Sequence, residues 1–284
     1  MKTLLAKEYK YRLRNCPLRP DSEHFKALKS EIFQMKLKNA ESKTTLPWKM
    51  SQLESALSHL KNNKSRDPEG YINEIFKSEL AGRNLKESLL LLCNKLKQGK
   101  LISNFMKVAN ITTVPKKGSR LLLTNERGIF RVSVIRSILM KLIYDAKMFD
   151  SQMGGRKGKG CRNNIFILNG IIHEQRNRKN EPILFQIYDY AQMFNSINLQ
   201  EAISDIYDCG FNDDLLPLIY QANAEVNMAV NTPHGLTERQ LIRNTVLQGA
   251  TFSSILASVQ LENMLRNQDM DTYTRTSNSN VGIS

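Results

Sequence analysis

The sequence contains only four cysteines among 284 residues, and their spacing argues against two kinds of covalently or metal-stabilised fold. Cys16, Cys93, Cys161 and Cys209 lie far apart, and no two of them form a Cys-x-x-Cys pair. A structural zinc site needs closely spaced ligand pairs, and disulfide frameworks are typical of short, cysteine-rich chains. We therefore expect reduced thiols in an intracellular protein.

Long apolar runs are also missing. The longest aliphatic run ends at Cys93 and is far below the roughly 20 residues that a membrane-spanning helix requires. The four histidines show no metal-ligand or catalytic-triad spacing, and no Walker-type phosphate loop is present. We therefore expect no membrane partner, and a nucleotide site of the P-loop type is not indicated.

Lysine is absent from the last third of the chain, although the formal net charge is +14. Residues 1–186 contain 37 Lys and Arg against 16 Asp and Glu, whereas residues 187–284 contain 4 against 11. A basic segment attracts polyanions because phosphates bind Lys and Arg and release counterions. The simpler alternative is a generally basic, solvated surface. The net charge changes from positive to negative near residue 187, which favours a phosphate-binding part joined to a part that can hold cations.

Hydrophobic periodicity predicts a chain in which helices and strands alternate. Helical spacing predicts helices at about 25–35, 53–60, 72–80, 85–97, 137–149, 163–175, 199–210 and 213–222. β-Branched runs predict strands at 108–115, 128–135 and 182–189, and two more around the Pro-His-Gly turn within 224–249. This order indicates a mixed α/β or α+β fold.

Asp189 follows the apolar run PILFQIY and is a candidate metal ligand. A carboxylate at the end of a buried strand is costly unless it is paired or bound to a cation, and Mg²⁺ is the natural partner of hard oxygen ligands. The alternative is an aspartate that caps a strand-to-helix turn. Phe194, five residues later, is equally consistent with ordinary core packing.

Two further segments have the composition of ligand-binding turns. Lys116, Lys117 and Arg127 flank a turn between two predicted strands, where they could hold a phosphate or simply be solvated. Gln248 and Gly249 follow another predicted strand. Glycine there permits close approach of the backbone to a ligand, although a simple bulge is the alternative.

Taken in order, six segments between about residues 50 and 265 resemble the reverse transcriptase of non-LTR (LINE-like) retrotransposons. They are ALSHLKNNKSRDPEGYINEIFK, ITTVPKKG, NERGIF, QMGGRKGKGCRNNIFILNGII, IYDYAQMFNSI and VLQGATFSS. The resemblance implies an RNA-directed DNA polymerase, a nucleotidyltransferase whose partners are RNA template, RNA–DNA hybrid and deoxynucleoside triphosphates.

The resemblance also implies an α+β fold with right-hand polymerase fingers and a partial palm, and without a thumb. The palm would be an antiparallel sheet with helices on one face. Residues 1–45 would form a basic N-terminal extension that is partly helical, residues 46–186 a fingers-like region, and residues 187–284 a partial palm-like region.

Residue roles follow from the same resemblance. Asp189 would hold the catalytic Mg²⁺ pair, which activates the primer 3′-hydroxyl and stabilises the leaving pyrophosphate. Phe194 would act as a steric gate under the sugar. The residues at the incoming nucleotide would be Lys116, Lys117, Arg127, Phe194, Gln248 and Gly249. The template-binding residues would be Lys61, Lys64, Arg156, Lys157 and Lys159.

The sequence departs from the family pattern at several positions. Met193-Phe194-Asn195 replaces Ala-Phe-Asp, Gly155 stands where an aromatic is usual, Glu69 replaces a common Asp, and Leu247 stands where Arg is frequent. No motif with the paired catalytic aspartates follows Gly249, because Asp269 and Asp271 lie in a polar stretch that reads as a surface loop.

A single carboxylate does not hold two divalent ions against a triphosphate, so we expect that this chain as written does not polymerise DNA. Three interpretations remain open at this point. The chain is a truncated or decayed reverse transcriptase, a module that binds RNA or RNA–DNA hybrid without catalysis, or a pseudogene product that does not fold stably.

Overall fold

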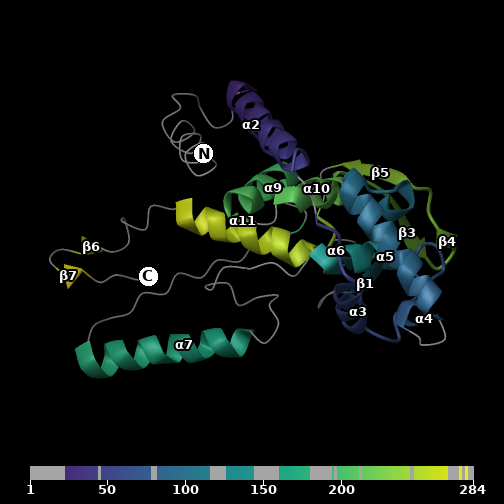
Figure 1. Cartoon of the computed structure of the whole chain (residues 1–284). Coiled ribbons are helices and arrows are strands. Elements are labelled where there is room, and N and C mark those ends of the chain that lie inside the picture. Colours follow the sequence, from purple (N-terminus) through teal and green to yellow (C-terminus); the bar gives the residue numbers. More distant parts are fainter. Residues whose placement is uncertain are drawn as a thin grey trace.

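The computed structural model describes most of the chain between Glu23 and Asn280 (Figure 1). The described residues are 23–43, 46–77, 82–115, 126–143, 160–179, 194, 197–210, 213–243, 246–267, 275–276 and 279–280. Helices and strands are mixed, as the alternating sequence pattern predicts. No helix in these segments is long and apolar enough to cross a membrane.

A mixed sheet lies at the centre of one half of the molecule. It contains β1 (Val108–Pro115), β2 (Glu126–Val132), β3 (Glu225–Thr232), β4 (Gly235–Leu236) and β5 (Gln240–Arg243). β1 pairs with β2 in antiparallel and with β3 in parallel orientation, and β3 also pairs with β4 and β5 in antiparallel orientation. The sheet is therefore mixed: the strands within residues 187–284 pair in antiparallel orientation, as expected for the palm-like part, and the parallel pair joins β3 to β1 of an earlier segment.

The two faces of the sheet differ in polarity. Ala109, Val226 and Met228 are buried on one face and pack with Leu247, which follows β5 in the chain. The register places Asn110, Thr112 and Arg131 together on the opposite face. Alternate residues of a strand point to opposite faces, so the β-branched run of β1 supplies one apolar and one polar row.

Helices α3 (Met50–Ser58), α4 (Asn73–Lys77), α5 (Gly82–Gly99) and α6 (Val134–Ile143) lie around this sheet (Figure 1). Leu53, Ala56 and Leu57 form the buried stripe of α3, as the helical spacing predicts. α6 contacts α3 and is nearly all apolar on its buried side. The short 3-10 helix η2 (Asn104–Lys107) lies between α5 and β1 in the chain.

A second group of helices consists of α2 (Glu23–Glu41), α9 (Leu199–Asp208), α10 (Leu216–Ala224) and α11 (Ser253–Asn267) (Figure 1). Phe33 of α2 is buried and meets Tyr220 of α10 edge to face at 5.0 Å. Lys29 and Lys36 of α2 form ion pairs of 2.7 and 2.9 Å with Glu201 and Asp208 at the two ends of α9.

The domain boundary predicted at residue 187 falls between segments that pack together. β1 and β3 come from opposite sides of it and pair in parallel. Helix α2, from the predicted N-terminal extension, packs against α9 and α10. The N-terminal, fingers-like and palm-like parts of the sequence therefore share their packing surfaces.

Helix α7 (Cys161–Glu174) has none of its residues buried and is continued by the π-helical turn η4 (Gln175–Lys179). It makes no extensive contact with any described element other than η4, and Figure 1 shows it apart from both groups of helices. The short strands β6 (Arg275–Thr276) and β7 (Ser279–Asn280) pair with each other near the end of the chain.

The predicted boundary between the second strand and the helix that follows it is wrong. The sequence predicts a strand that continues to residue 135 and a helix from about 137, but β2 ends at Val132 and α6 begins at Val134. The reason is tertiary: the Asp67 carboxylate accepts a hydrogen bond of 2.9 Å from the Val134 backbone N–H and so caps α6. The predicted strand at 182–189 lies outside the described residues.

Candidate nucleic-acid interface

The basic turn Lys61–Lys64 is held in place by side chains of α4. Asn73 donates a hydrogen bond of 2.7 Å to the Lys61 carbonyl, and Lys77 donates to the Leu60 carbonyl at 2.9 Å. The Asn63 backbone N–H donates to Glu74 Oε1 and lowers the pKa of that carboxyl. The backbone of the turn is thus fixed from within the protein. Both lysine side chains remain exposed.

The next residues, Arg66–Gly70, form a loop that is built around Asp67, which is only 8 % exposed. Asp67 Oδ1 accepts from the Glu69 and Tyr71 backbone N–H groups at 3.1 and 2.7 Å, while Oδ2 caps α6. Gly70 has a φ of +91°, a conformation that favours glycine. This loop therefore connects the basic turn firmly to the start of α6.

Strand β2 presents a second basic row beside this loop. Arg127, Ile129 and Arg131 alternate onto one face, and Arg127 is exposed. Arg131 Nη1 donates to the Arg66 carbonyl at 3.3 Å, which joins the loop to the strand across 65 positions of sequence. The Arg66–Gly70 loop, which follows the basic turn, and strand β2 are therefore neighbours in the fold.

The Gln248–Gly249 turn lies beside β2 and is hydrogen-bonded to its backbone. The Phe130 backbone N–H donates to the Gln248 carbonyl at 3.1 Å, so this turn extends the hydrogen bonding of the sheet. Gly249 has a φ of +94°, and a Cβ there would lie 3.5 Å from Ile129 Cγ2. Glycine is thus needed for the backbone conformation, while the space beside the strand is sufficient for a methyl group.

We refer to Lys61, Lys64, Arg66, Arg127, Arg131, Gln248 and Gly249 together as the β2 surface. Its electrostatics are dominated by positive charge. Burial and the nearby charge of Lys61 lower the pKa of Lys141 on α6, as expected where like charges gather. Partial burial and Asp67 raise the pKa of Glu69, whereas Arg239 opposes this rise.

The polar face of the sheet under this surface has unused hydrogen-bonding capacity. Asn110 Oδ1, Thr112 Oγ1 and Arg131 Nε are buried and have no hydrogen-bond partner within the described part of the chain. Buried polar atoms are normally satisfied, so such a cluster indicates contact with water or with a polar ligand.

Five of the residues predicted from sequence lie in segments that these hydrogen bonds link to one another: Lys61, Lys64, Arg127, Gln248 and Gly249. Phe194 lies elsewhere, half-buried against the main hydrophobic core, which agrees with the packing alternative. The other predicted site residues lie outside the described part of the chain: Asp189, Lys116, Lys117, Arg156, Lys157 and Lys159. The placement of the proposed Mg²⁺ ligand is therefore not described.

Sequence reasoning missed Arg66, Arg131 and Lys141. A signal for Arg131 was present, because it lies in the strand predicted at 128–135 and follows Arg127 by four residues, an even spacing that puts both on one face of an extended segment. Arg66 stands in the same polar turn as Lys61 and Lys64. Lys141 had no such signal, since its proximity to Lys61 depends on how α6 is oriented by the Asp67 cap.

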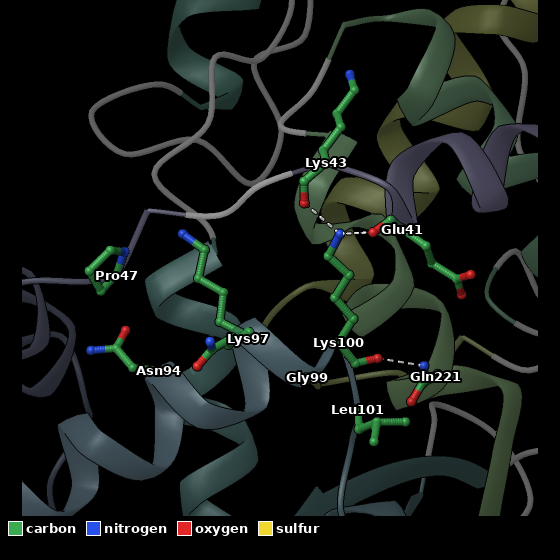
Figure 2. Close-up of a pocket in the computed structure, with 10 residues that line it drawn as sticks. Glu41, Lys43, Pro47, Asn94, Lys97, Gly99, Lys100, Leu101 and Gln221 are labelled. Carbon is green, nitrogen blue, oxygen red and sulfur yellow. Dashed lines mark hydrogen bonds between the residues drawn. The ribbon is translucent and has the colours of Figure 1, made fainter.

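A cavity of about 670 Å³ elsewhere in the molecule also has a cationic lining, between the ends of α2 and α5 and helix α10 (Figure 2). Its lysines already have partners. Lys100 donates to the carbonyls of Ala40, Glu41 and Lys43, and Lys97 donates to the Leu46 carbonyl at 2.7 Å. These ammonium groups hold the segment that follows α2, and they do not converge on a ligand.

Neither the protein-family models nor the curated proteins compared with this chain give a match. Among the described residues no group of three or more His, Cys, Asp and Glu side chains is placed to hold a metal ion. The functional interpretation therefore depends on the β2 surface and on the sequence resemblance.

Proposed function

We propose that this chain binds RNA template or RNA–DNA hybrid on the β2 surface, as the fingers part of a reverse transcriptase-like domain. The observation that carries the proposal is the meeting of three segments that are far apart in sequence. Hydrogen bonds from Arg131 to Arg66 and from Phe130 to Gln248 join the basic turn, β2 and the Gln-Gly turn. The resemblance assigns these same segments to template and nucleotide binding.

The chemistry of the surface suits a sugar-phosphate backbone. Exposed Lys and Arg side chains on a fixed main chain can neutralise successive phosphates without a large ordering cost. Binding of this kind weakens linearly with the logarithm of salt concentration, because each neutralised phosphate releases counterions.

Fluorescence anisotropy with a labelled RNA–DNA hybrid tests this proposal. Replacing both Lys61 and Lys64 by Gln should lower affinity by about tenfold and make the salt slope less negative by about 2. The matched control replaces Lys38 and Lys95, two exposed lysines on α2 and α5, by Gln. The proposal fails if both double variants lose affinity equally, since binding would then depend on net charge alone.

Catalysis is a separate question, because the proposed Mg²⁺ ligand Asp189 is assigned from the sequence and lies outside the described residues. A module that only binds should hold hybrid equally well in Mg²⁺ and in EDTA. Primer extension that requires Mg²⁺ and deoxynucleoside triphosphates, and that is lost in Asp189→Ala, would instead make the chain an active polymerase. We expect binding without primer extension by this chain alone.

The unstable-product interpretation makes an opposite prediction for the purified protein. A chain that lacks a stable core should unfold without a cooperative transition. The described residues include a large buried cluster that extends through α2, α3, α6, α9, α10 and α11. We therefore expect a single cooperative thermal transition, measured by circular dichroism on the monomeric fraction.

A further inference from the structure

A cavity of about 400 Å³ lies where one end of the sheet meets the helices α9 and α10. Lys107 ends η2 and immediately precedes β1, Glu225 begins β3, and Arg243 ends β5. All three residues line the cavity, and the described lining residues are distinct from those of the β2 surface. The volume lies in the range of small-molecule sites, which is roughly 300–1,000 Å³.

The register of the sheet explains why these three charged residues share one cavity. β3 lies between β1 and β5, because Val108 pairs in parallel with Asn227 and Glu225 pairs in antiparallel with Arg243. The start of β1, the start of β3 and the end of β5 therefore lie at the same end of the sheet. Lys107 and Arg243 thus flank the first residues of β3 from opposite sides, although they are far apart in sequence.

The charges that line the cavity favour an anion. Lys107 and Arg243 each contribute one positive charge and Glu225 one negative charge, so the described lining carries a net charge of +1. Arg243 Nε lies 3.7 Å from Glu225 Oε1, and this ion pair restricts the guanidinium. The guanidinium has two further nitrogens, which can donate together to two oxygens of one phosphate.

The two helices supply the uncharged part of the lining. Leu199 of α9 is buried, and Tyr220 of α10 and Gln200 of α9 are half-buried. Asn198 Oδ1 accepts hydrogen bonds from the Gln200 and Glu201 backbone N–H groups. α9 therefore contributes side chains to the cavity, because its first amides are already used by its cap. The lining thus combines two cations with an aromatic and an aliphatic side chain.

We propose that this cavity binds a small organic phosphate monoester. Lys107 and Arg243 hold the phosphate group, because charge-assisted hydrogen bonds from ammonium and guanidinium groups suit its oxygens. The organic part lies against Tyr220 and Leu199. Inorganic phosphate would fill only a small part of about 400 Å³ and would leave this apolar part of the lining unused. The site does not depend on the nucleic-acid binding proposed for the β2 surface.

Isothermal titration calorimetry of the whole chain with phenyl phosphate tests the proposal, because this probe carries its phosphate on an apolar ring. It should bind about tenfold more tightly than inorganic phosphate, since burial of the ring adds affinity. Lys107→Gln and Arg243→Gln should each weaken its binding by about tenfold. Two controls should leave its affinity unchanged: Lys38→Gln on α2, and the double replacement of Lys61 and Lys64 by Gln on the β2 surface.

Equal affinities for phenyl phosphate and inorganic phosphate would overturn the proposal. So would an affinity that is unchanged in Lys107→Gln and Arg243→Gln, or one that falls equally in the Lys61 and Lys64 double variant. If either cavity variant does not fold, brief acetylation of the natural chain decides the question. Saturating phenyl phosphate should protect Lys107 but not Lys38, and unchanged reactivity of Lys107 contradicts the site. Loss of hybrid binding by the β2 surface would leave these results unaffected.

Discussion

The turn and loop at residues 61–70 and the helix α7 differ sharply in how the rest of the molecule holds them. Both belong to segments that the resemblance assigns to the template. The loop is polar, yet its carbonyls, amides and the Asp67 carboxylate are bonded to α4 and α6. α7 presents apolar side chains, and Phe166 is 81 % exposed, without extensive packing against other described elements.

This difference shows that exposed basic residues and exposed apolar residues carry different information about function. The lysines of the loop are exposed on a main chain that is already ordered, so they can bind a polyanion at little entropic cost. The apolar side chains of α7 are instead largely exposed and lack extensive packing against the other described elements. The loop is therefore the better-supported part of the candidate interface.

The largest effect that distinguishes the two regions should come from Asp67→Ala. This change removes the acceptor of three backbone N–H groups, one of which begins α6. We expect the free energy of unfolding to fall by about 3 kcal/mol, measured by urea denaturation. Asp67→Asn, which keeps one acceptor oxygen, should give an intermediate loss.

Glu69→Gln is the control for that experiment, because Glu69 is exposed in the same loop. Its effect should stay within about 0.5 kcal/mol. Equal losses in Asp67→Ala and Glu69→Gln would mean that the loop is not fastened to α6 as described.

A smaller difference in stability should separate alanine substitutions at two glycines. Gly249 has a φ of +94°, so Gly249→Ala forces an alanine into the left-handed region and should cost about 1–2 kcal/mol. Gly170 lies within α7, where a Cβ would meet nothing within 4 Å. Gly170→Ala should therefore raise helicity without a loss of stability. Urea denaturation and far-ultraviolet circular dichroism measure both, and a Gly249→Ala variant as stable as Gly170→Ala contradicts the turn geometry.

The smallest perturbation is labelling of the cysteines, which leaves the sequence unchanged. Cys161 is exposed at the start of α7, whereas Cys93 of α5 is buried and burial raises its pKa to about 12. Iodoacetamide requires the thiolate and should modify Cys161 quickly and Cys93 only on unfolding. Peptide mapping by mass spectrometry resolves the two sites. If Cys161 is protected as well as Cys93 in the native protein, α7 is covered in solution and the contrast with the loop disappears.

Much of the fold follows from local sequence signals. The β-branched run gives β1 with its observed bounds, and the helix at 199 ends before Gly210, whose φ is +74°. The start of α6 did not follow, because Val134 and Ile135 favour strands until Asp67, 67 positions away, supplies the helix cap. The parallel pairing of β1 with β3 is likewise a long-range choice that no local pattern encodes.

The candidate site was predictable residue by residue but not as an assembly. The position of Arg127 beside a predicted turn suggested a phosphate contact, whereas Lys61 and Lys64 were suggested by the family resemblance alone. Their common surface depends on the hydrogen bond from Arg131 to the Arg66 carbonyl, which the sequence does not reveal.

Lysine footprinting on the natural chain tests the central claim most directly. The protein is acetylated briefly with and without RNA–DNA hybrid, and the modified lysines are quantified by mass spectrometry. The account predicts that hybrid protects Lys61 and Lys64, while the exposed Lys38 and Lys95 on α2 and α5 react equally in both samples. Unchanged reactivity of Lys61 and Lys64 in the presence of saturating hybrid would contradict it.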